Sequence, residues 1–279
     1  MKIYLSGRTK DLLKRWGARR VVDVALCDPD ILSLAGRIRV VTEVKPVTAH
    51  CILDRRRSLP RLTTGAKRLD ELLGGGLEAG YVTEVAGEFG AGKTQLCHQL
   101  AVMVQLPGER GGLGARALYV DTEGTFRPER VVSIAKYRGL DPEEALENIV
   151  YVEARDPASL LAAVLEAESL DTKLVIVDTL LAPLIGESGS EGPSRRQYLL
   201  SRLVRELRRL AAGGRVVVVA NRMSRDRPAG GLVMALGSHY RLLMVKVGGA
   251  RRRVELLRAP HLPPGSATVV LTEEGVLDA

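Results

Sequence analysis

Short runs of apolar residues alternate along most of the chain with longer segments in which apolar positions recur at helical spacing. The apolar runs cover residues 81–86, 117–120, 149–152, 174–177, 215–220 and 242–247. Runs of this length between helical segments are typical of a parallel sheet flanked by helices. We therefore predict an α/β fold with a mostly parallel central sheet for this part of the chain.

Residue types mark the starts of several helices. Asp141 and Asp156 each precede a proline, which places an N-cap before a proline at the first helical position. Residues 194–212 carry leucine and valine at helical spacing, with arginines largely on the other faces. Two interpretations of this basic face stay open: the solvated side of a core helix, or a stripe that binds DNA.

The N-terminal residues follow a different pattern. Residues 9–16, 21–27 and 28–36 are predicted to form short helices, and a basic tether at 54–60 follows them. Composition therefore places a domain boundary near residue 60. The predicted domains are a small helical N-terminal domain with its basic linker, residues 1–58, and a core domain, residues 59–279.

Charge favours a polyanionic partner. The 279 residues include 41 Lys and Arg against 33 Asp and Glu, a formal net charge of +8. Such a balance is typical of proteins that bind nucleic acid, and a merely soluble basic surface is the alternative. Three scattered cysteines are too few for a disulfide framework or a zinc site. No signal peptide or membrane-spanning run is recognisable, so we expect a cytoplasmic protein without a membrane partner.

A glycine-rich segment provides the strongest candidate chemistry. Residues 87–94 match G-x-x-x-x-G-K-T between an apolar run and a helical pattern, the context that a Walker A loop requires. Its backbone N–H groups and the helix N-terminus would face the phosphates of ATP. Lys93 is expected to hold the β and γ phosphates, and Thr94 to bind Mg²⁺. The predicted ATP-binding segment consists of Gly87, Glu88, Phe89, Gly90, Ala91, Gly92, Lys93, Thr94 and Gln95.

Two apolar runs end in carboxylates. Residues 174–177 lead to Asp178, the candidate Walker B aspartate that holds Mg²⁺ directly or through water. Residues 117–120 lead to Asp121 and Glu123. Since parallel strands end at the same edge of a sheet, Glu123 is a candidate general base for the water that attacks the γ phosphate. Alternatively, Glu123 is an N-cap or a surface carboxylate of the helix that follows.

Together these residues make the chain resemble the RecA/RadA recombinase family, in particular archaeal RadA and its paralogues such as RadB. The resemblance covers most of residues 53–279 and is carried by segments 64–65, 69–76, 87–95, 105–107, 121–130 and 259–263. It implies a RecA-like P-loop ATPase core that uses ATP and Mg²⁺, with slow, DNA-stimulated hydrolysis. It also implies that Glu123 is the activating glutamate and that Arg130 stacks on adenine. Residues 12–17 and 34–36 resemble the family's helix-hairpin-helix domain without its last helix.

Several positions depart from the family pattern. The phenylalanine of the F-x-x-A polymerisation motif falls on Pro46 and its alanine on Ala49. Loss of an aromatic anchor weakens an interface, so self-polymerisation is not expected. Arg222 stands where RadA proteins have a glutamine that senses the γ phosphate. It is a candidate γ-phosphate contact, or else an exposed loop residue.

The two loops that contact DNA in the family also differ. The second is short, and Arg225 and Arg227 are its candidate DNA-binding residues. The first, residues 184–193, carries two glutamates and no arginine, which argues against tight contact with a strand. Arg258 replaces the aspartate of the family's ATP cap.

The sequence thus predicts an accessory RadA paralogue in homologous recombination and DNA repair. We expect it to bind DNA without sequence preference, preferring single strands, and to act on the main RadA recombinase. One alternative is a self-sufficient strand-exchange recombinase whose filament forms through another contact. A second is a regulatory ATPase switch of the same superfamily that does not respond to DNA.

Overall fold

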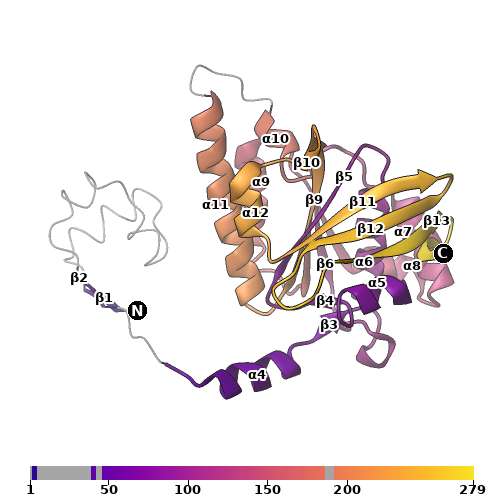
Figure 1. Ribbon diagram of the computed structural model, residues 1–279, viewed down its shortest axis with the longest axis horizontal. Coiled ribbons are helices and arrows are strands. Elements are labelled where there is room, and N and C mark those ends of the chain that lie inside the picture. The colour runs from indigo at the N-terminus through magenta and orange to yellow at the C-terminus, as the bar shows by residue number, and fades with distance from the viewer. Residues whose placement is uncertain (1, 5–38, 42–45, 186–191) are drawn as a thin grey trace. The chain divides into compact units, whose positions relative to one another are not determined.

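The structure is a computed structural model that describes residues 2–4, 39–41, 46–185 and 192–279 (Figure 1). Contacts between residues divide the chain into two compact units, Met1–Arg57 and Ser58–Ala279. The large sheet, the helices that cover it and the candidate site all belong to the second unit. Among the described residues, no helix has the length and apolar character needed to span a membrane.

The second unit contains a ten-stranded sheet. Its strands are β5 (Val82–Gly87), β6 (Ala117–Asp121), β7 (Ile149–Glu153), β8 (Leu174–Asp178), β9 (Val216–Ser224), β10 (Arg227–Pro228), β11 (Tyr240–Gly248), β12 (Arg251–Arg258), β13 (Gly265–Thr272) and β14 (Gly275–Asp278). Six neighbours run parallel in the order β11, β5, β9, β8, β6, β7. The prediction of a mostly parallel sheet is confirmed, because each of the six apolar runs forms one of these strands.

An antiparallel extension, β12 to β14, continues the sheet beyond β11. These three strands are not among the six predicted from apolar runs. Four of the eight residues of β12 are arginines, so this strand shows no apolar run. A short antiparallel pair of β3 (Arg61–Leu62) and β4 (Leu77–Glu78) lies outside the large sheet.

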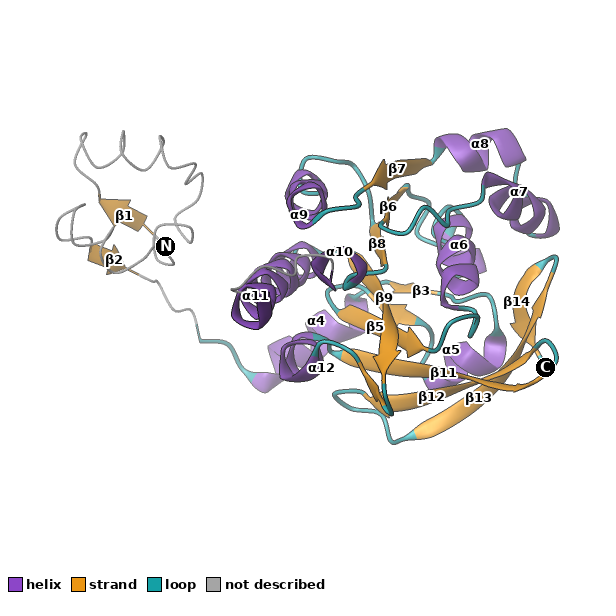
Figure 2. Ribbon diagram, turned by 90° about the horizontal axis from the view of Figure 1, so that it is seen from above, coloured by secondary structure: helices purple, strands orange, loops and turns teal. Residues whose placement is uncertain are grey.

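Helices cover both faces of the parallel strands (Figure 2). One core contains residues of α5 (Lys67–Leu72), α6 (Lys93–Met103), α7 (Pro128–Tyr137) and α8 (Pro142–Glu147). The other contains residues of α9 (Pro157–Glu166), α10 (Ala182–Ile185), α11 (Gly192–Ala212) and α12 (Gly231–Gly237). Along β8, Leu174 and Ile176 belong to the first core, and Val175 and Val177 to the second. The central strands are continuous apolar runs because both of their faces are buried.

The predicted helix starts are present at both aspartates. The Asp141 side chain accepts the N–H of Glu144 at 2.9 Å, at the start of α8. Asp156 accepts the N–H groups of Ala158 and Ser159 at the start of α9. These bonds satisfy N–H groups that a helix start leaves without partners.

The long helix α11 turns its leucines into the second core, while part of its basic face meets solvent. The exposed arginines are Arg195, Arg196, Arg205 and Arg208. Both interpretations of this face, a solvated surface or a DNA-binding stripe, stay open.

In the first unit, β1 (Lys2–Tyr4) pairs antiparallel with β2 (Arg39–Val41). The helices and the helix-hairpin-helix motifs predicted between residues 9 and 36 lie outside the described residues, as do residues 186–191 of the first DNA loop. α4 (Ala49–Ser58) has no buried residue, and Pro46 and Ala49 of the altered polymerisation motif are exposed.

The register of the parallel strands brings the candidate residues to one edge of the sheet. Gly87 at the end of β5 is paired with Arg222 on β9. Asp121 at the end of β6 is paired with Asp178 on β8. Because β8 and β9 are direct neighbours, these pairs lie side by side at the carboxyl edge, where open α/β sheets bind ligands.

The end of β14 caps α5 and so ties the last strand to the start of the unit. The two carboxylate oxygens of Asp278 accept the backbone N–H groups of Lys67 and Arg68, each at 2.8 Å. The N-cap residue of α5, Ala66, has no side chain that could do this. Asp278 is therefore the acceptor for this helix start.

Replacing Asp278 by alanine is expected to lower the free energy of unfolding by about 1 kcal/mol, because two helix N–H groups lose their acceptor. Chemical denaturation followed by circular dichroism measures the change. Glu274→Ala, at an exposed carboxylate just before β14, is the control and should leave the midpoint unchanged. Equal midpoints for Asp278→Ala and the wild-type protein would contradict the capping role.

Candidate functional site

The loop between β5 and α6 is tightly wound. Gly90 and Gly92 have φ angles of 72° and 102°, which glycine adopts at little cost. α6 begins directly after the loop, at Lys93. The Lys93 ammonium donates to the carbonyl oxygens of Gly87 and Glu88, both at 2.9 Å. The loop therefore presents a buried cation beside a helix N-terminus, an arrangement suited to an anion.

Charges of both signs surround Lys93. Burial lowers the pKa of Lys93, while the carboxylates of Asp178 and Glu123 act in the opposite direction by favouring the ammonium. The positive charge of Lys246 also lowers the Lys93 pKa. The two predicted acidic partners thus lie close enough to Lys93 to influence its protonation.

Asp178 is 1% exposed at the end of β8. Burial raises its pKa, and the Thr94 and Tyr119 hydroxyls partly offset this by favouring the charged carboxylate. The Tyr119 hydroxyl donates to Oδ2 at 2.8 Å. Oδ1 is buried and has no hydrogen-bond partner among the described residues. A carboxylate oxygen left unpaired near a threonine hydroxyl fits a hard cation or a water bound to one.

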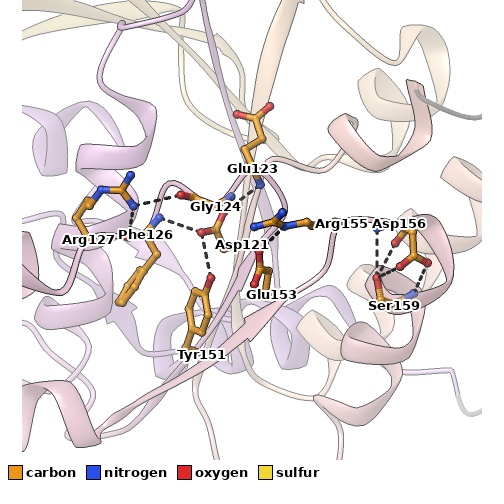
Figure 3. Close-up of polar contacts among 10 residues, drawn as sticks. All are labelled: Asp121, Glu123, Gly124, Phe126, Arg127, Tyr151, Glu153, Arg155, Asp156 and Ser159. Carbon is orange, nitrogen blue, oxygen red and sulfur yellow. Dashed lines mark hydrogen bonds and ion pairs between the residues drawn. The ribbon is translucent and has the colours of Figure 1, made fainter.

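The loop after β6 is organised around the buried carboxylate of Asp121 (Figure 3). The backbone N–H groups of Glu123, Gly124 and Phe126 donate to it at 3.1, 2.9 and 2.9 Å. The Tyr151 hydroxyl adds a bond at 3.3 Å. Asp121 therefore shapes the loop, while the Glu123 side chain points away from this cluster in Figure 3.

Glu123 is held at the cleft by the neighbouring strand end. Its Oε1 accepts the Thr179 hydroxyl at 3.3 Å. The Thr122 hydroxyl donates to the Thr179 carbonyl at 2.7 Å and accepts the Thr179 N–H at 2.8 Å, which ties the ends of β6 and β8 together. Glu123 does not cap α7, whose N-cap residue is Arg127.

These segments border a cleft of about 620 Å³, a volume suited to a small ligand. Its lining consists of Glu88, Phe89, Gly90, Gly92, Lys93, Thr94, Gln95, Glu123, Thr125, Thr179, Arg222, Met223 and Leu271. The structure thus brings together most of the predicted nucleotide-binding residues. Four others, Gly87, Ala91, Arg130 and Asp178, are not part of this lining.

Arg222 lies in the wall of the cleft. The sequence had left open whether it is a γ-phosphate contact or an exposed loop residue. Its Nε is buried and has no hydrogen-bond partner among the described residues. A guanidinium with an unused donor therefore shares the cleft with Lys93 and Glu123.

A buried network holds the backbone at Arg222. The Asn221 amide nitrogen donates to Glu84 Oε1 at 2.6 Å and to the Ala229 carbonyl at 2.8 Å, and its oxygen accepts the Arg222 N–H at 2.8 Å. Glu84 also accepts Arg241 Nε at 2.5 Å. Glu84 and Asn221 are both 0% exposed. Since both amide donors of Asn221 are used, its orientation is determined by its partners.

Arg130 lies on α7 and is held by its neighbours. Its Nε donates to Gln95 Oε1 at 2.8 Å, and its two terminal nitrogens donate to the carbonyls of Glu273 and Thr272 at 2.7 and 2.9 Å. All of these bonds lie in the plane of the guanidinium. They fix its orientation.

The second DNA loop of the family is a tight hairpin in this chain. β9 continues to Ser224 and pairs with β10. Arg225 in the turn has a φ of 54°, and both Arg225 and Arg227 are exposed. Arg258 donates to the carbonyl of Ala235 and is not part of the cleft lining.

Three residues beside the loop were not found from the sequence. Arg252 and Lys246 approach it from β12 and β11, and no motif marks them. His98 lies one helical turn after Thr94, and this spacing was its only signal. Its Nδ1 donates to the Thr94 carbonyl at 2.8 Å, and its Nε2 accepts the Arg127 N–H at 3.0 Å. His98 therefore links α6 to the loop that carries Glu123.

The sheet topology and the loop, cleft and strand-end carboxylates at its carboxyl edge define a RecA-like P-loop ATPase. More specifically, the chain belongs to the Rad51 family, whose model matches residues 55–279. Members of this family are DNA-dependent ATPases. The family match covers the whole sheet and every residue of the candidate site.

Two archaeal relatives match almost the whole chain. Both are named DNA repair and recombination protein RadA. The protein from Metallosphaera sedula is 38% identical over 291 aligned residues, which cover 94% of this chain and 90% of the relative. The protein from Aeropyrum pernix is 37% identical over 297 residues, which cover 97% of this chain and 93% of the relative. The predicted family is therefore confirmed.

Acid is expected to destabilise the protein through His98. Burial lowers the pKa of His98 from its usual 6.5 to about 4. The unfolded chain therefore binds a proton more readily than the folded protein between these values. The stabilisation is complete above pH 6.5 and is lost as the pH falls towards 4, by about 3 kcal/mol in all.

Denaturation midpoints measured between pH 7 and pH 4 test this expectation. His98→Gln should flatten the dependence because it removes the titrating ring. His50→Gln, at a side chain that is 80% exposed, is the control and should keep the wild-type slope. An unchanged slope in His98→Gln would contradict the assignment.

Proposed function

We propose that this protein binds and hydrolyses ATP in the cleft, through the roles that the family resemblance assigns. The observation that carries the proposal is the meeting of Lys93, Thr94 and Glu123 in one cleft, with Asp178 buried at the adjoining strand end. Lys93 and the N–H groups at the start of α6 bind the β and γ phosphates. Residues 87–95 form the phosphate loop.

Glu123 is the proposed general base. Its carboxylate faces the cleft and is oriented by the Thr179 hydroxyl, so it can accept a proton from a water molecule near the γ phosphate. Arg222, with its unused Nε donor, is proposed to contact the γ phosphate as charge develops.

Mg²⁺ fits the Thr94 hydroxyl and Asp178, whose buried Oδ1 has no other hydrogen-bond partner among the described residues. When bound, the ion would neutralise part of the charge of the β and γ phosphates. Arg130 is proposed to stack on adenine, and its in-plane bonds to Gln95, Thr272 and Glu273 support this by holding the guanidinium still.

In the cell, we propose an accessory role for this protein in homologous recombination and DNA repair, beside a main RadA recombinase. Arg225 and Arg227 are the proposed contacts to DNA, single-stranded by preference. The short hairpin limits how much of a strand it can hold. Pro46 in place of an aromatic anchor would weaken self-polymerisation.

A self-sufficient recombinase is the second candidate. It is favoured by the identity of 37–38% to two proteins named RadA over nearly their whole length. The two candidates share the ATP site and differ in assembly. A regulatory ATPase switch would instead show no response to DNA.

Two substitutions separate binding from hydrolysis. Lys93→Ala should weaken ATP binding at least about a hundredfold, because Lys93 is the one cationic residue within segment 87–95. Glu123→Gln should bind ATP as the wild-type protein does and lose about two to four orders of magnitude in kcat. Calorimetric titration and phosphate release measure the two quantities. Wild-type ATP affinity in Lys93→Ala, or unchanged turnover in Glu123→Gln, would refute the corresponding role.

Strand exchange separates the two recombination candidates. With single-stranded DNA, homologous duplex and ATP, the purified protein alone should show little exchange, and its addition should change the rate of the host's main RadA recombinase. Electron microscopy on the same samples should show no long regular filaments of this protein alone. Efficient exchange by the protein alone would overturn the accessory role. ATPase activity that is the same with and without DNA at every salt concentration would favour the regulatory ATPase switch.

A further inference from the structure

The hairpin of β11 and β12 packs directly against the phosphate loop. β11 lies beside β5, with Met244 opposite Gly87, and Lys246 and Arg252 are paired across the hairpin. The approach is close: a Cβ on Gly87 would lie 2.7 Å from the Met244 carbonyl oxygen. The loop cannot move towards this side without displacing the hairpin.

The Arg252 side chain extends from the hairpin and donates hydrogen bonds to the loop. It is buried, with the residue 9% exposed. Nε donates to the Ala91 carbonyl at 3.2 Å, and one terminal nitrogen donates to the Gly90 carbonyl at 3.3 Å. The other terminal nitrogen donates to the carbonyls of Gly249 and Arg251, both at 2.8 Å. One guanidinium thus joins two loop carbonyls to the turn of the hairpin.

No carboxylate neutralises this cation among the described residues, since all four acceptors are backbone carbonyls. A buried charge without an ionic partner is costly unless an opposite charge compensates it. The phosphates proposed to bind in the loop would supply the negative charge that compensates the Arg252 guanidinium.

The hydrogen bond from Arg252 to the Ala91 carbonyl also determines the direction of the next N–H group along the chain. In a trans peptide, the carbonyl of one residue and the N–H of the next point in opposite directions. With the Ala91 carbonyl bonded to Arg252, the Gly92 N–H must point away from the hairpin. Gly92 is part of the cleft lining. A Gly92 N–H held in this direction is free of the hairpin and can donate to an anion in the cleft.

Lys246 adds a second positive charge at the same place. A Cβ on Gly90 would lie 3.2 Å from its ammonium nitrogen, which puts the cation against the loop. Its charge is also among the influences that lower the Lys93 pKa. Lys93, Lys246 and Arg252 thus surround one glycine-rich loop.

We propose that the β11–β12 hairpin is a second cationic support of the phosphate loop and sets the affinity for the phosphate tail of the nucleotide. Arg252 is a positioning residue that holds the Gly90 and Ala91 carbonyls away from the cleft, and Lys246 supplies charge beside Gly90. The proposal rests on the ATP-binding role proposed for the loop. The competing interpretation is that Arg252 only closes the hairpin turn, in which case its loss would affect stability and not affinity.

Substitutions of Arg252 separate its geometry from its charge. Arg252→Lys keeps the charge but cannot hold two loop carbonyls and the hairpin turn at once, so it should raise the KM for ATP and the Kd for ADP about tenfold. Arg252→Met removes the charge as well and should raise both about a hundredfold. Lys246→Gln should raise both about threefold at low salt and less at 0.5 M salt.

In all three variants, kcat at saturating ATP should stay within about twofold of the wild-type value, because Glu123 and Asp178 are unchanged. A loss of folded protein would do the reverse, since it lowers the apparent kcat and leaves the KM unchanged. Arg251→Met, at an exposed arginine of the same hairpin, is the matched control and should bind ATP normally. Thermal unfolding of each variant without nucleotide reports the folded fraction, and Arg252→Lys and Lys246→Gln carry the test if Arg252→Met does not fold.

Wild-type KM and Kd in a folded Arg252→Lys and Lys246→Gln would overturn the proposal, as would a fall in kcat at constant KM. A failure of the proposed function has a different signature. In that case the wild-type protein would not bind ATP, or Lys93→Ala would bind it as well as the wild-type protein does.

Discussion

The constraint on which the rest depends is the parallel pairing of β5 with its two neighbours. It sets Gly87 opposite Arg222 on one side and opposite Met244 on the other. The phosphate loop therefore leaves the sheet between two neighbours. On one side is β9, which places Arg222 in the wall of the cleft, and on the other is the β11–β12 hairpin, which packs against the loop. A slip of one residue in either pairing would turn every side chain of the strand to the wrong core. The two buried cores thus enforce the geometry of the site.

Burying polar groups at the carboxyl edge of the sheet is costly, and hydrogen bonds compensate most of the buried groups. Asp121 accepts three backbone N–H groups, and Asn221 uses both amide donors and its oxygen. Seven side chains contain a buried polar atom without a partner among the described residues, and two of them, Asp178 and Arg222, lie at the candidate site. Unsatisfied groups of opposite charge beside a phosphate loop are what a ligand with both phosphates and a cation would satisfy.

The ATP site and the surfaces beyond it differ in how closely they follow the family pattern. At the site, the phosphate loop, Asp178 and Glu123 match the pattern in sequence and meet at one sheet edge. Arg222, in the wall of the cleft, is a departure within the site. Beyond it, the short arginine hairpin and Pro46 depart from the pattern at positions that concern DNA and assembly. Hydrolysis and filament formation depend on different contacts, so one can persist while the other changes. This is the physical argument for the accessory role that we propose.

The sequence by itself determined the parallel strands, the helix starts at Asp141 and Asp156, and the phosphate loop, because each depends on residues that are neighbours along the chain. It could not decide whether Arg222 was a loop residue or part of the cleft, and it missed His98, Lys246 and Arg252. Those residues reach the site through contacts across strands and helices: Arg252 meets the Ala91 carbonyl, 161 positions away. Only the tertiary structure brings such groups together, since register and packing, not local pattern, determine which distant side chains become neighbours.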